Sequence, residues 1–264
     1  MVGETGRSML IHLPRGFAPG QSVPLLLLLH GSTSNGAAML EHSGLTATAD
    51  RHGFIVAAPD GALRVGTGFA WNVPGVPTVA GTMPSAGDAN DVAYLVTAID
   101  WLATQRCIDR ARVYATGASG GGRMSSWLGC VAADRFAAIA PVVGLRAGNP
   151  LHDNPREPDP TTCKPSQSMP IIAFAGDKDR VNPIGGGGAP YWQYTMHAAE
   201  RRWATLNRCV AAPTTRWVAS GIYEESYRNC RDGAAVVARI MVGGGHDWVV
   251  DNEAMWTFLE QYRR

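Results

Sequence analysis

Five consecutive leucines, between Pro24 and His30, limit most strongly what this chain can fold into. A strand with one face in water alternates apolar and polar residues, whereas this run is apolar on both of the faces that a strand would present. We therefore expect a strand that other elements cover on both sides. Such strands are typical of an α/β fold with a mostly parallel sheet and helices on each face.

Short apolar runs of this kind recur along the chain and alternate with segments of helical periodicity. The predicted strands are residues 8–13, 24–30, 54–58, 112–116, 137–142, 171–175 and 236–242. The predicted helices are one that Asp88 caps, one that begins just after Ser119, one over residues 191–206 and one over 252–262. A β-hairpin is expected between Cys209 and Cys230. Because no repeat or linker divides the chain, we expect a single α/β domain over residues 1–264.

The helix after Ser119 is expected to turn four apolar side chains toward the core, namely those of Met124, Trp127, Leu128 and Val131.

Two segments interrupt the alternation of strands and helices. Residues 144–170 contain six prolines and no apolar periodicity, and residues 185–188 are four consecutive glycines. Loops of this length inside a compact domain are usually functional or disordered, and both follow predicted strands.

A G-x-S-x-G sequence at residues 117–121 joins a β-rich run to a helical pattern. On a tight turn from strand to helix, the serine adopts a strained backbone conformation and side chains at the flanking positions would collide with their neighbours, which explains the glycines. The turn would lift the hydroxyl of Ser119 above the sheet. The pattern therefore predicts a nucleophile elbow, and the alternative is a chance glycine-rich loop in a chain with 31 glycines.

A serine hydroxyl is a weak nucleophile, so it needs a base and a group that orients the base. Of the seven histidines, His246 lies in a short loop directly after a late apolar strand, and three preceding glycines let that loop bend back over the sheet. Either Asp177 or Asp179, after the strand at 171–175, is placed to orient His246. The order serine, aspartate, histidine is that of α/β-hydrolases.

An oxyanion hole is expected from two backbone N–H groups in such a fold. One belongs to Ser32, which follows the leucine-rich strand, and the other to Gly120, directly after the nucleophile. His30 is interpreted as structural.

With these residues in place, the sequence resembles the α/β-hydrolases of the feruloyl esterase and polyhydroxybutyrate depolymerase-like group (carbohydrate esterase family 1-like). The matching stretches span residues 25–250 and include Leu29-His30-Gly31, Ala70-Trp71-Asn72, the segment 112–121, the segment 138–144 and Gly243-Gly244-Gly245-His246-Asp247-Trp248. The resemblance implies an α/β-hydrolase fold and a serine esterase that acts through an acyl-enzyme and needs no metal or cofactor. In this group the acid is the last residue of a His-Gly-Thr-Ala-Asp frame. Residues 175–179 fit that frame, so the acid's role passes to Asp179.

The five cysteines alone are consistent either with two disulfides and one free thiol or with five buried thiols, and no C-x-x-C spacing suggests a metal site. The resemblance implies the pairs Cys130–Cys163 and Cys209–Cys230, which leaves Cys107 without a partner. The first seven residues contain no apolar leader. Because members of the group are commonly secreted, we expect a secreted or extracytoplasmic protein whose leader is absent from this chain, with a cytoplasmic protein as the alternative.

Four aromatic residues near the predicted catalytic edge are candidates for stacking on a phenolic acyl group: Trp71, Tyr191, Trp192 and Trp248. The alternative is that they fill the core or brace loops. The expected substrate is a feruloyl or other hydroxycinnamoyl ester of plant polysaccharide, and the alternatives are a polyhydroxybutyrate-type polyester and a short-chain acyl or acetyl ester of xylan. The segment 144–170 lies where hydrolases of this type often carry a lid, and because its prolines restrict the backbone we expect a fixed wall rather than a mobile flap.

The charge and hydropathy of the chain argue against several other classes of protein. With 23 basic and 22 acidic residues the chain has no surplus to neutralise a phosphate backbone, so a nucleic-acid partner is not expected. The longest uncharged apolar run, residues 136–145, is too short to cross a bilayer. A serine peptidase or acyltransferase on the same scaffold and an inactive carbohydrate-binding module remain as rival interpretations. No feature indicates an oligomeric state.

Overall fold

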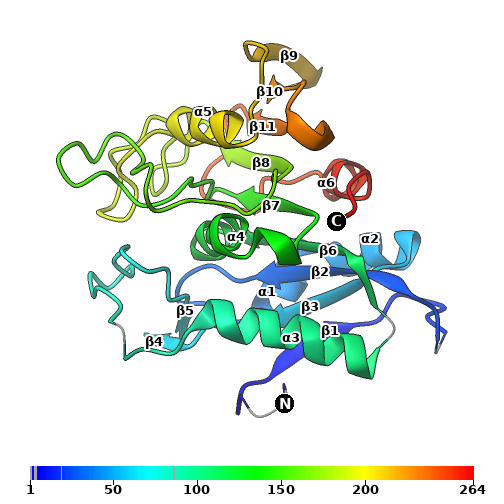
Figure 1. Cartoon of the computed structure of the whole chain (residues 1–264). Helices are drawn as coiled ribbons and strands as arrows, with labels where there is room; N and C mark the ends of the chain where they lie inside the picture. The colour runs from blue at the N-terminus through cyan, green and yellow to red at the C-terminus, as the bar shows by residue number, and fades with distance from the viewer. Residues whose placement is uncertain (1, 3–4, 19, 86, 107) are drawn as a thin grey trace.

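The computed structural model describes residues 2, 5–18, 20–85, 87–106 and 108–264 (Figure 1). Its strands are β1 (Met9–His12), β2 (Val23–Leu29), β3 (Ile55–Pro59), β4 (Leu63–Val65), β5 (Gly68–Ala70), β6 (Ile108–Ala118), β7 (Ala138–Val142), β8 (Ile171–Gly176), β9 (Thr214–Ala219), β10 (Ile222–Tyr227) and β11 (Val236–Met241). Nine of them form one sheet in the order β1-β3-β2-β6-β7-β8-β11-β10-β9, and β4 and β5 form a separate hairpin. The six strands from β3 to β11 run parallel, whereas β1, β10 and β9 are antiparallel to their neighbours.

Helices cover both faces of this sheet (Figure 1). They are α1 (Gly36–Ser43), α2 (Leu45–His52), α3 (Asp91–Gln105), α4 (Gly120–Val131), α5 (Met196–Leu206) and α6 (Asn252–Leu259). Side chains of α3, α4 and α5 belong to one apolar core, and those of α1, α2 and α6 belong to a second core on the opposite face. The predicted mostly parallel α/β architecture is therefore confirmed, and it is the α/β-hydrolase fold. Among the described residues, no helix is both long and apolar enough to span a membrane.

The leucine run shows why both cores exist. Every residue from Leu25 to Leu29 is 0% exposed. Leu25, Leu27 and Leu29 point into the core beneath α3, α4 and α5, whereas Leu26 and Leu28 point into the other core. Successive side chains of a strand face opposite sides, so a run of five leucines is stable only where both sides are dry.

Seven predicted strands are present with ends shifted by at most four residues, and the hairpin between Cys209 and Cys230 is formed by β9 and β10. Two helix starts were predicted too early. Asn90, not Asp88, caps α3, while the Asp88 carboxylate accepts the backbone N–H of Ser85 at 2.7 Å. Thr195 caps α5, so residues 191–194 precede the helix.

Three further expectations differ from the structure. The helices α1 and α2 were not predicted, because their short sequences carry little apolar periodicity. The last helix ends at Leu259 rather than at residue 262. In α4, Met124 and Leu128 are buried as predicted, but Val131 at its end is 46% exposed.

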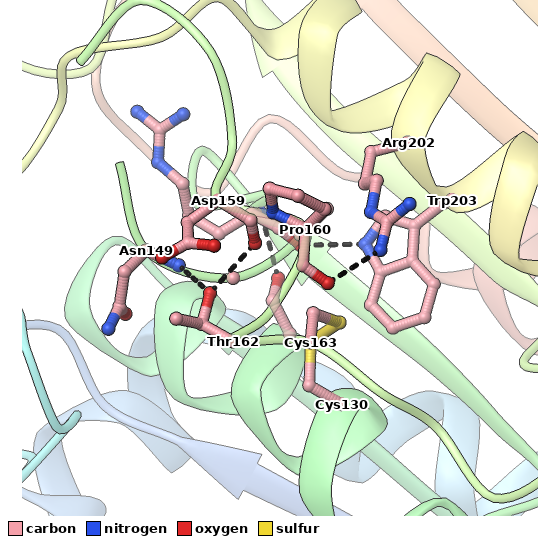
Figure 2. Close-up of a disulfide and its surroundings, with 12 residues drawn as sticks. Cys130, Asn149, Asp159, Pro160, Thr162, Cys163, Arg202 and Trp203 are labelled. Atoms are coloured by element: carbon pink, nitrogen blue, oxygen red, sulfur yellow. Dashed lines mark hydrogen bonds between the residues drawn. A yellow bond between two sulfur atoms is a disulfide. The ribbon is translucent and has the colours of Figure 1, made fainter. Parts of the chain in front are cut away.

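Two disulfides join segments that are distant in the sequence. They are Cys130–Cys163 and Cys209–Cys230, the pairs that the family resemblance implies. Cys107, for which a free thiol is one expectation, lies outside the described residues. The first disulfide attaches the proline-rich segment 144–170 to α4 (Figure 2).

Hydrogen bonds hold the same segment in place. Figure 2 shows Thr162 Oγ1 accepting the backbone N–H of Asn149 at 2.9 Å and Arg202 of α5 donating to the Pro160 carbonyl at 3.0 Å. Trp203 of α5 also donates from Nε1 to the Arg146 carbonyl at 2.6 Å. The segment is therefore fixed to two helices, as its prolines suggest.

Candidate active site

Ser119 occupies the sharp turn between β6 and α4. Its backbone has φ 53° and ψ −110°, a strained conformation for a residue with a side chain. The glycines on either side are required by packing, because a Cβ at Gly117 or Gly121 would overlap the carbonyl oxygen of Leu29. The backbone N–H of Ser119 donates to Val142 on the neighbouring strand at 2.9 Å, which anchors the turn to the sheet.

The turn opens onto a cavity of about 590 Å³ at the carboxyl ends of the parallel strands. The loops after β2, β6, β7 and β11 contribute to its wall, and Ser32, Ser119, Val143, His246 and Trp248 are among its lining residues. The structure therefore brings Ser119 and His246, 127 positions apart, to one site. This edge of an open α/β sheet is where ligands bind in such folds.

His246 is held by Asp179. Its Nδ1 lies 2.8 Å from Asp179 Oδ2, and the other carboxylate oxygen accepts the backbone N–H groups of Val181 and Asn182 at 2.8 Å each. Asp179 is 4% exposed. Burial alone would raise the pKa of Asp179, but the hydrogen bonds from His246 and the two N–H groups outweigh it, so the pKa lies below its usual value. The carboxylate therefore stays charged and fixes the imidazole.

Asp177, the other candidate acid, has a different contact. Its Oδ1 accepts the backbone N–H of Gly243 at 2.7 Å, at the start of the loop that carries His246. Its second oxygen lies 3.8 Å from the ammonium group of Lys178. Asp177 thus stabilises the base of the histidine loop, while Asp179 contacts the imidazole itself.

Among the described residues, no hydrogen bond joins Ser119 to His246, although both line the same cavity. Hydrogen bonds between nucleophile and base are often long or poorly aligned without substrate and tighten when it binds. The hydroxyl, the imidazole and the carboxylate are the three groups of a serine-hydrolase triad, in which the imidazole takes the proton and the carboxylate stays charged and orients the ring.

The backbone N–H groups of Ser32 and Gly120 lie next to each other, beside Ser119. A Cβ added to Gly120 would lie 3.0 Å from the backbone nitrogen of Ser32, so the two residues are in contact. Gly120 begins α4, where a helix leaves its N–H groups without helical partners. The N–H of Ser32 donates to no backbone or side-chain group in the part of the chain that the structure describes. Both are thus available to a developing oxyanion.

His30 shapes the loop that carries Ser32. Its Nε2 accepts the backbone N–H of Gly61 at 2.9 Å and its Nδ1 lies 2.7 Å from the Gly31 carbonyl oxygen, a pattern that requires a neutral ring. Burial lowers the pKa of His30, which keeps the ring neutral. The indole of Trp71 donates to the His30 carbonyl at 2.8 Å and supports the same loop.

The expectation that four aromatic side chains line the cleft does not hold for three of them. Trp71, Tyr191 and Trp192 are 4%, 8% and 1% exposed, and none lines the main cavity. Tyr191 and Trp192 instead lie under the buried guanidinium groups of Arg123 and Arg146, with 4.1 Å and 3.3 Å from ring centre to guanidinium carbon. Because these rings cover buried cations, they brace the loops. Trp248 does lie on the cavity wall.

The proline-rich segment also contributes less than expected. No residue of 144–170 lines the main cavity as the described residues define it. Val143, the residue just before the segment, does line the cavity.

No sequence pattern predicts a hydrogen-bonded pair, His42 and Asp247, on the cavity rim. His42 of α1 lies with Nε2 2.7 Å from Asp247 Oδ1, and Glu41 lines the wall beside it. The hydrogen bonds from the backbone N–H of Trp248 and from His42 lower the pKa of Asp247. The rim is therefore polar and carries charge directly beside His246. The partners are 205 positions apart, and α1 itself was not predicted, so no local pattern could have revealed the pair.

Comparisons with known proteins agree with this geometry. The family model described as Esterase PHB depolymerase matches residues 7–154, more than half of the chain. The chain is 31% identical to feruloyl esterase B of Piromyces equi over 97% of its own length, and 32% identical to the poly(3-hydroxybutyrate) depolymerase of Ralstonia pickettii over 73%. It spans 45% and 37% of the lengths of these two proteins.

A solved structure gives the same result for the fold. The acetyl xylan esterase from Aspergillus awamori superposes with a TM-score of 0.69 at 14% identity, over 98% of this chain and 96% of that one. With the fold, the strained serine and the family match in agreement, the chain belongs to the esterase PHB depolymerase family.

Proposed function

We propose that the chain is a serine carboxylesterase that hydrolyses esters through an acyl-enzyme intermediate. The observation that carries the proposal is that Ser119, Ser32 and His246 line one cavity, with Asp179 bonded to His246 and Gly120 in contact with Ser32 beside Ser119. Each of these parts has a separate role in acyl transfer. The names of the relatives, all esterases or depolymerases of polyesters, support the same reaction class.

In the first step, the Oγ of Ser119 attacks the ester carbonyl while Nε2 of His246 takes its proton. The oxyanion is held by the N–H groups of Ser32 and Gly120, and Asp179 stabilises the imidazolium. His246 then gives its proton to the leaving alcohol, and the serine ester remains. Water, activated by His246, attacks this ester and releases the acid and the free serine. No step needs a metal or cofactor.

The proposed substrates are feruloyl or related hydroxycinnamoyl esters. Support comes from the relationship to feruloyl esterase B over almost the whole chain and from Trp248, whose ring is available on the cavity wall. Acetylated xylan and polyhydroxybutyrate are the alternatives, because other relatives are named for these substrates. The alcohol portion of the substrate, whether a small molecule or a polymer, would meet the polar rim formed by His42 and Asp247.

Replacing the nucleophile tests the reaction class. Ser119→Ala is expected to lower kcat on a p-nitrophenyl ester by about a million-fold, since a triad acts as a unit. A fluorophosphonate probe should label the wild-type protein at Ser119 and leave the variant unlabelled. Normal turnover by Ser119→Ala would remove Ser119 from the mechanism, and an unlabelled, inactive wild type would indicate a binding module.

The substrate is tested by comparing kcat/KM on methyl ferulate, p-nitrophenyl butyrate and acetylated xylan, with clearing of polyhydroxybutyrate films as a further arm. The proposal expects the highest kcat/KM on methyl ferulate. A higher kcat/KM on either of the other substrate classes would leave the assignment as an esterase in place and change only the proposed substrate.

We also propose that the protein acts outside the reducing cytoplasm. Its two disulfides support this, because such bonds persist in oxidising compartments and are rare in cytosolic proteins.

A further inference from the structure

A histidine and two glutamates converge away from the catalytic cavity. His197 and Glu200 lie three residues apart on α5, which places them on one face of the helix, and Glu225 reaches them from β10. Nδ1 of His197 lies 3.0 Å from Glu225 Oε2 and 3.5 Å from Glu200 Oε1. One ligand atom from each of the three residues lies within 4.8 Å of the others.

The hydrogen bonds within this cluster do not satisfy all of its members. Nδ1 of an imidazole carries at most one proton, and both glutamates point an oxygen at it. Glu225 is the nearer acceptor. Oε1 of Glu200 therefore has no hydrogen-bond partner among the described residues, although the Glu200 side chain is only 2% exposed. A buried carboxylate oxygen without a partner is costly, and burial accordingly raises the pKa of Glu200. Either a proton on Glu200 or a cation that binds all three side chains would remove this cost.

We propose that His197, Glu200 and Glu225 bind one divalent transition-metal ion, for which Zn²⁺ is the best-suited species. An imidazole nitrogen with two carboxylate oxygens is a ligand set that zinc accepts, and the two carboxylates balance the charge of the ion. Ligand atoms on a tetrahedral zinc ion are about 3.3 Å apart, given bonds of about 2.0 Å. The two separations around Nδ1, 3.0 and 3.5 Å, are close to this value, and all three ligand atoms lie within 4.8 Å of one another. The imidazole disfavours Ca²⁺ and Mg²⁺, which prefer oxygen ligands.

The position of the cluster allows an ion to enter and suggests what it does. The His197 side chain is 39% exposed, so the site opens to solvent, and water would complete the coordination. The ion would link α5 to β10, next to the sheet edge formed by β9. None of the three ligands lines the catalytic cavity, so binding would stabilise the fold without taking part in ester hydrolysis.

The test is a Zn²⁺ titration of the full chain, with binding measured by calorimetry and stabilisation measured by thermal unfolding. We expect one equivalent to bind to the wild type and, at about 100 times the Kd, to raise Tm by about 5 °C or more. Glu225→Gln and His197→Gln should each weaken binding by about 100-fold or more, the upper range found even for outer partners of metal ligands. Glu253→Gln is the matched control, because Glu253 pairs with His52 at 2.7 Å on the surface without a second glutamate, and it should bind Zn²⁺ like the wild type.

Three results would overturn the proposal. They are the absence of saturable binding up to about 1 mM Zn²⁺, equal affinity in Glu225→Gln and the wild type, and binding lost equally in Glu253→Gln. Should the cluster variants fail to fold, anomalous diffraction at the zinc edge from wild-type crystals decides the question. A peak between the three side chains supports the site, and a peak elsewhere, for example at His246, refutes it.

Discussion

Two aspartates two positions apart have distinct contacts, and this difference leads to a prediction at the scale of the residue. Asp179 contacts the imidazole of His246, whereas Asp177 accepts the backbone N–H of Gly243. Asp179→Asn is expected to lower kcat on an aryl ester by about 10,000-fold, because an amide neither selects the right tautomer nor stabilises the imidazolium. Steady-state kinetics at pH 7 measures this effect.

Asp177→Asn is the matched control for that experiment. The amide oxygen of asparagine can still accept the N–H of Gly243, so kcat is expected to change by less than about tenfold. Equal losses in the two variants, or a larger loss in Asp177→Asn, would mean that the His246 loop and not the imidazole contact controls the rate.

At this scale the sequence predicted residues whose roles follow from local patterns. The glycines around Ser119 and those before His246 identify both positions, since each motif is contiguous. Contacts between distant segments were not predictable. Trp71 supports the His30 loop, and Trp192 covers Arg146, but neither relation leaves a pattern in the sequence around the tryptophan. An aromatic residue near a predicted catalytic edge is equally compatible with a cleft wall and with a brace.

At the scale of the element, a cluster of charges stabilises the antiparallel edge of the sheet. Glu224 of β10 is 1% exposed and pairs with Arg216 of β9, Arg239 of β11 and Arg228. Burial by itself would raise the pKa of Glu224, but the hydrogen bonds from Arg216 and Arg239 outweigh it and the pKa is lowered. The carboxylate therefore contributes stability that is complete above its unfolded pKa, near 4.5, and is lost as the pH falls through the lower folded pKa.

Glu224→Gln is accordingly expected to reduce the free energy of unfolding by about 2 kcal/mol at pH 7, less than the ~3 to 5 kcal/mol of a fully buried pair because Arg216 and Arg228 are exposed. The deficit should remain constant down to about pH 5.5 and shrink below about pH 4.5, where the unfolded wild-type chain takes up a proton at Glu224 while the folded carboxylate, with its lower pKa, still stays charged. Denaturant unfolding at a series of pH values measures it.

The exposed Glu157, whose side chain forms no ion pair with the described residues, provides the control variant Glu157→Gln, which should match the wild type throughout. A deficit for Glu224→Gln that is independent of pH would show that its packing matters rather than its charge.

Elements were predictable where apolar residues recur strongly. The strands β2, β7 and β8 are buried along their whole lengths, so their sequences are apolar almost throughout and their positions were predicted closely. The helices α1 and α2 have eight residues each and bury only three of them, which leaves too short a stripe for periodicity to show. The start of α5 was misplaced because apolar residues at 191–194, which cover buried arginines, continue its pattern toward the N-terminus.

At the scale of the whole molecule, the two apolar cores and the two cross-links together determine how stable the fold is. The disulfides close segments of 33 and 21 residues. By the loss of chain entropy in the unfolded state, each is worth about 3.5 kcal/mol, and together they contribute about 7 kcal/mol. Folded domains are stable by only about 5 to 15 kcal/mol, so the two disulfides supply a large part of the stability of the fold.

Reduction is therefore expected to lower the Tm of the whole protein by about 14 to 28 °C, since 1 kcal/mol corresponds to about 2 to 4 °C for a chain of this size. Thermal unfolding with and without reductant measures the shift, and alkylation followed by mass spectrometry counts the thiols. Four of the five cysteines form disulfides, so at most one should react before reduction and all five afterwards.

The variant Cys130→Ala/Cys163→Ala removes one of the two disulfides, so its Tm should fall by about half of the shift seen on full reduction. Because no residue of 144–170 lines the cavity, its kcat/KM on a small ester at 25 °C should stay within a few-fold of the wild type. An unchanged Tm in a sample with five alkylated cysteines would show that the two cores suffice and that the disulfides add no measurable stability.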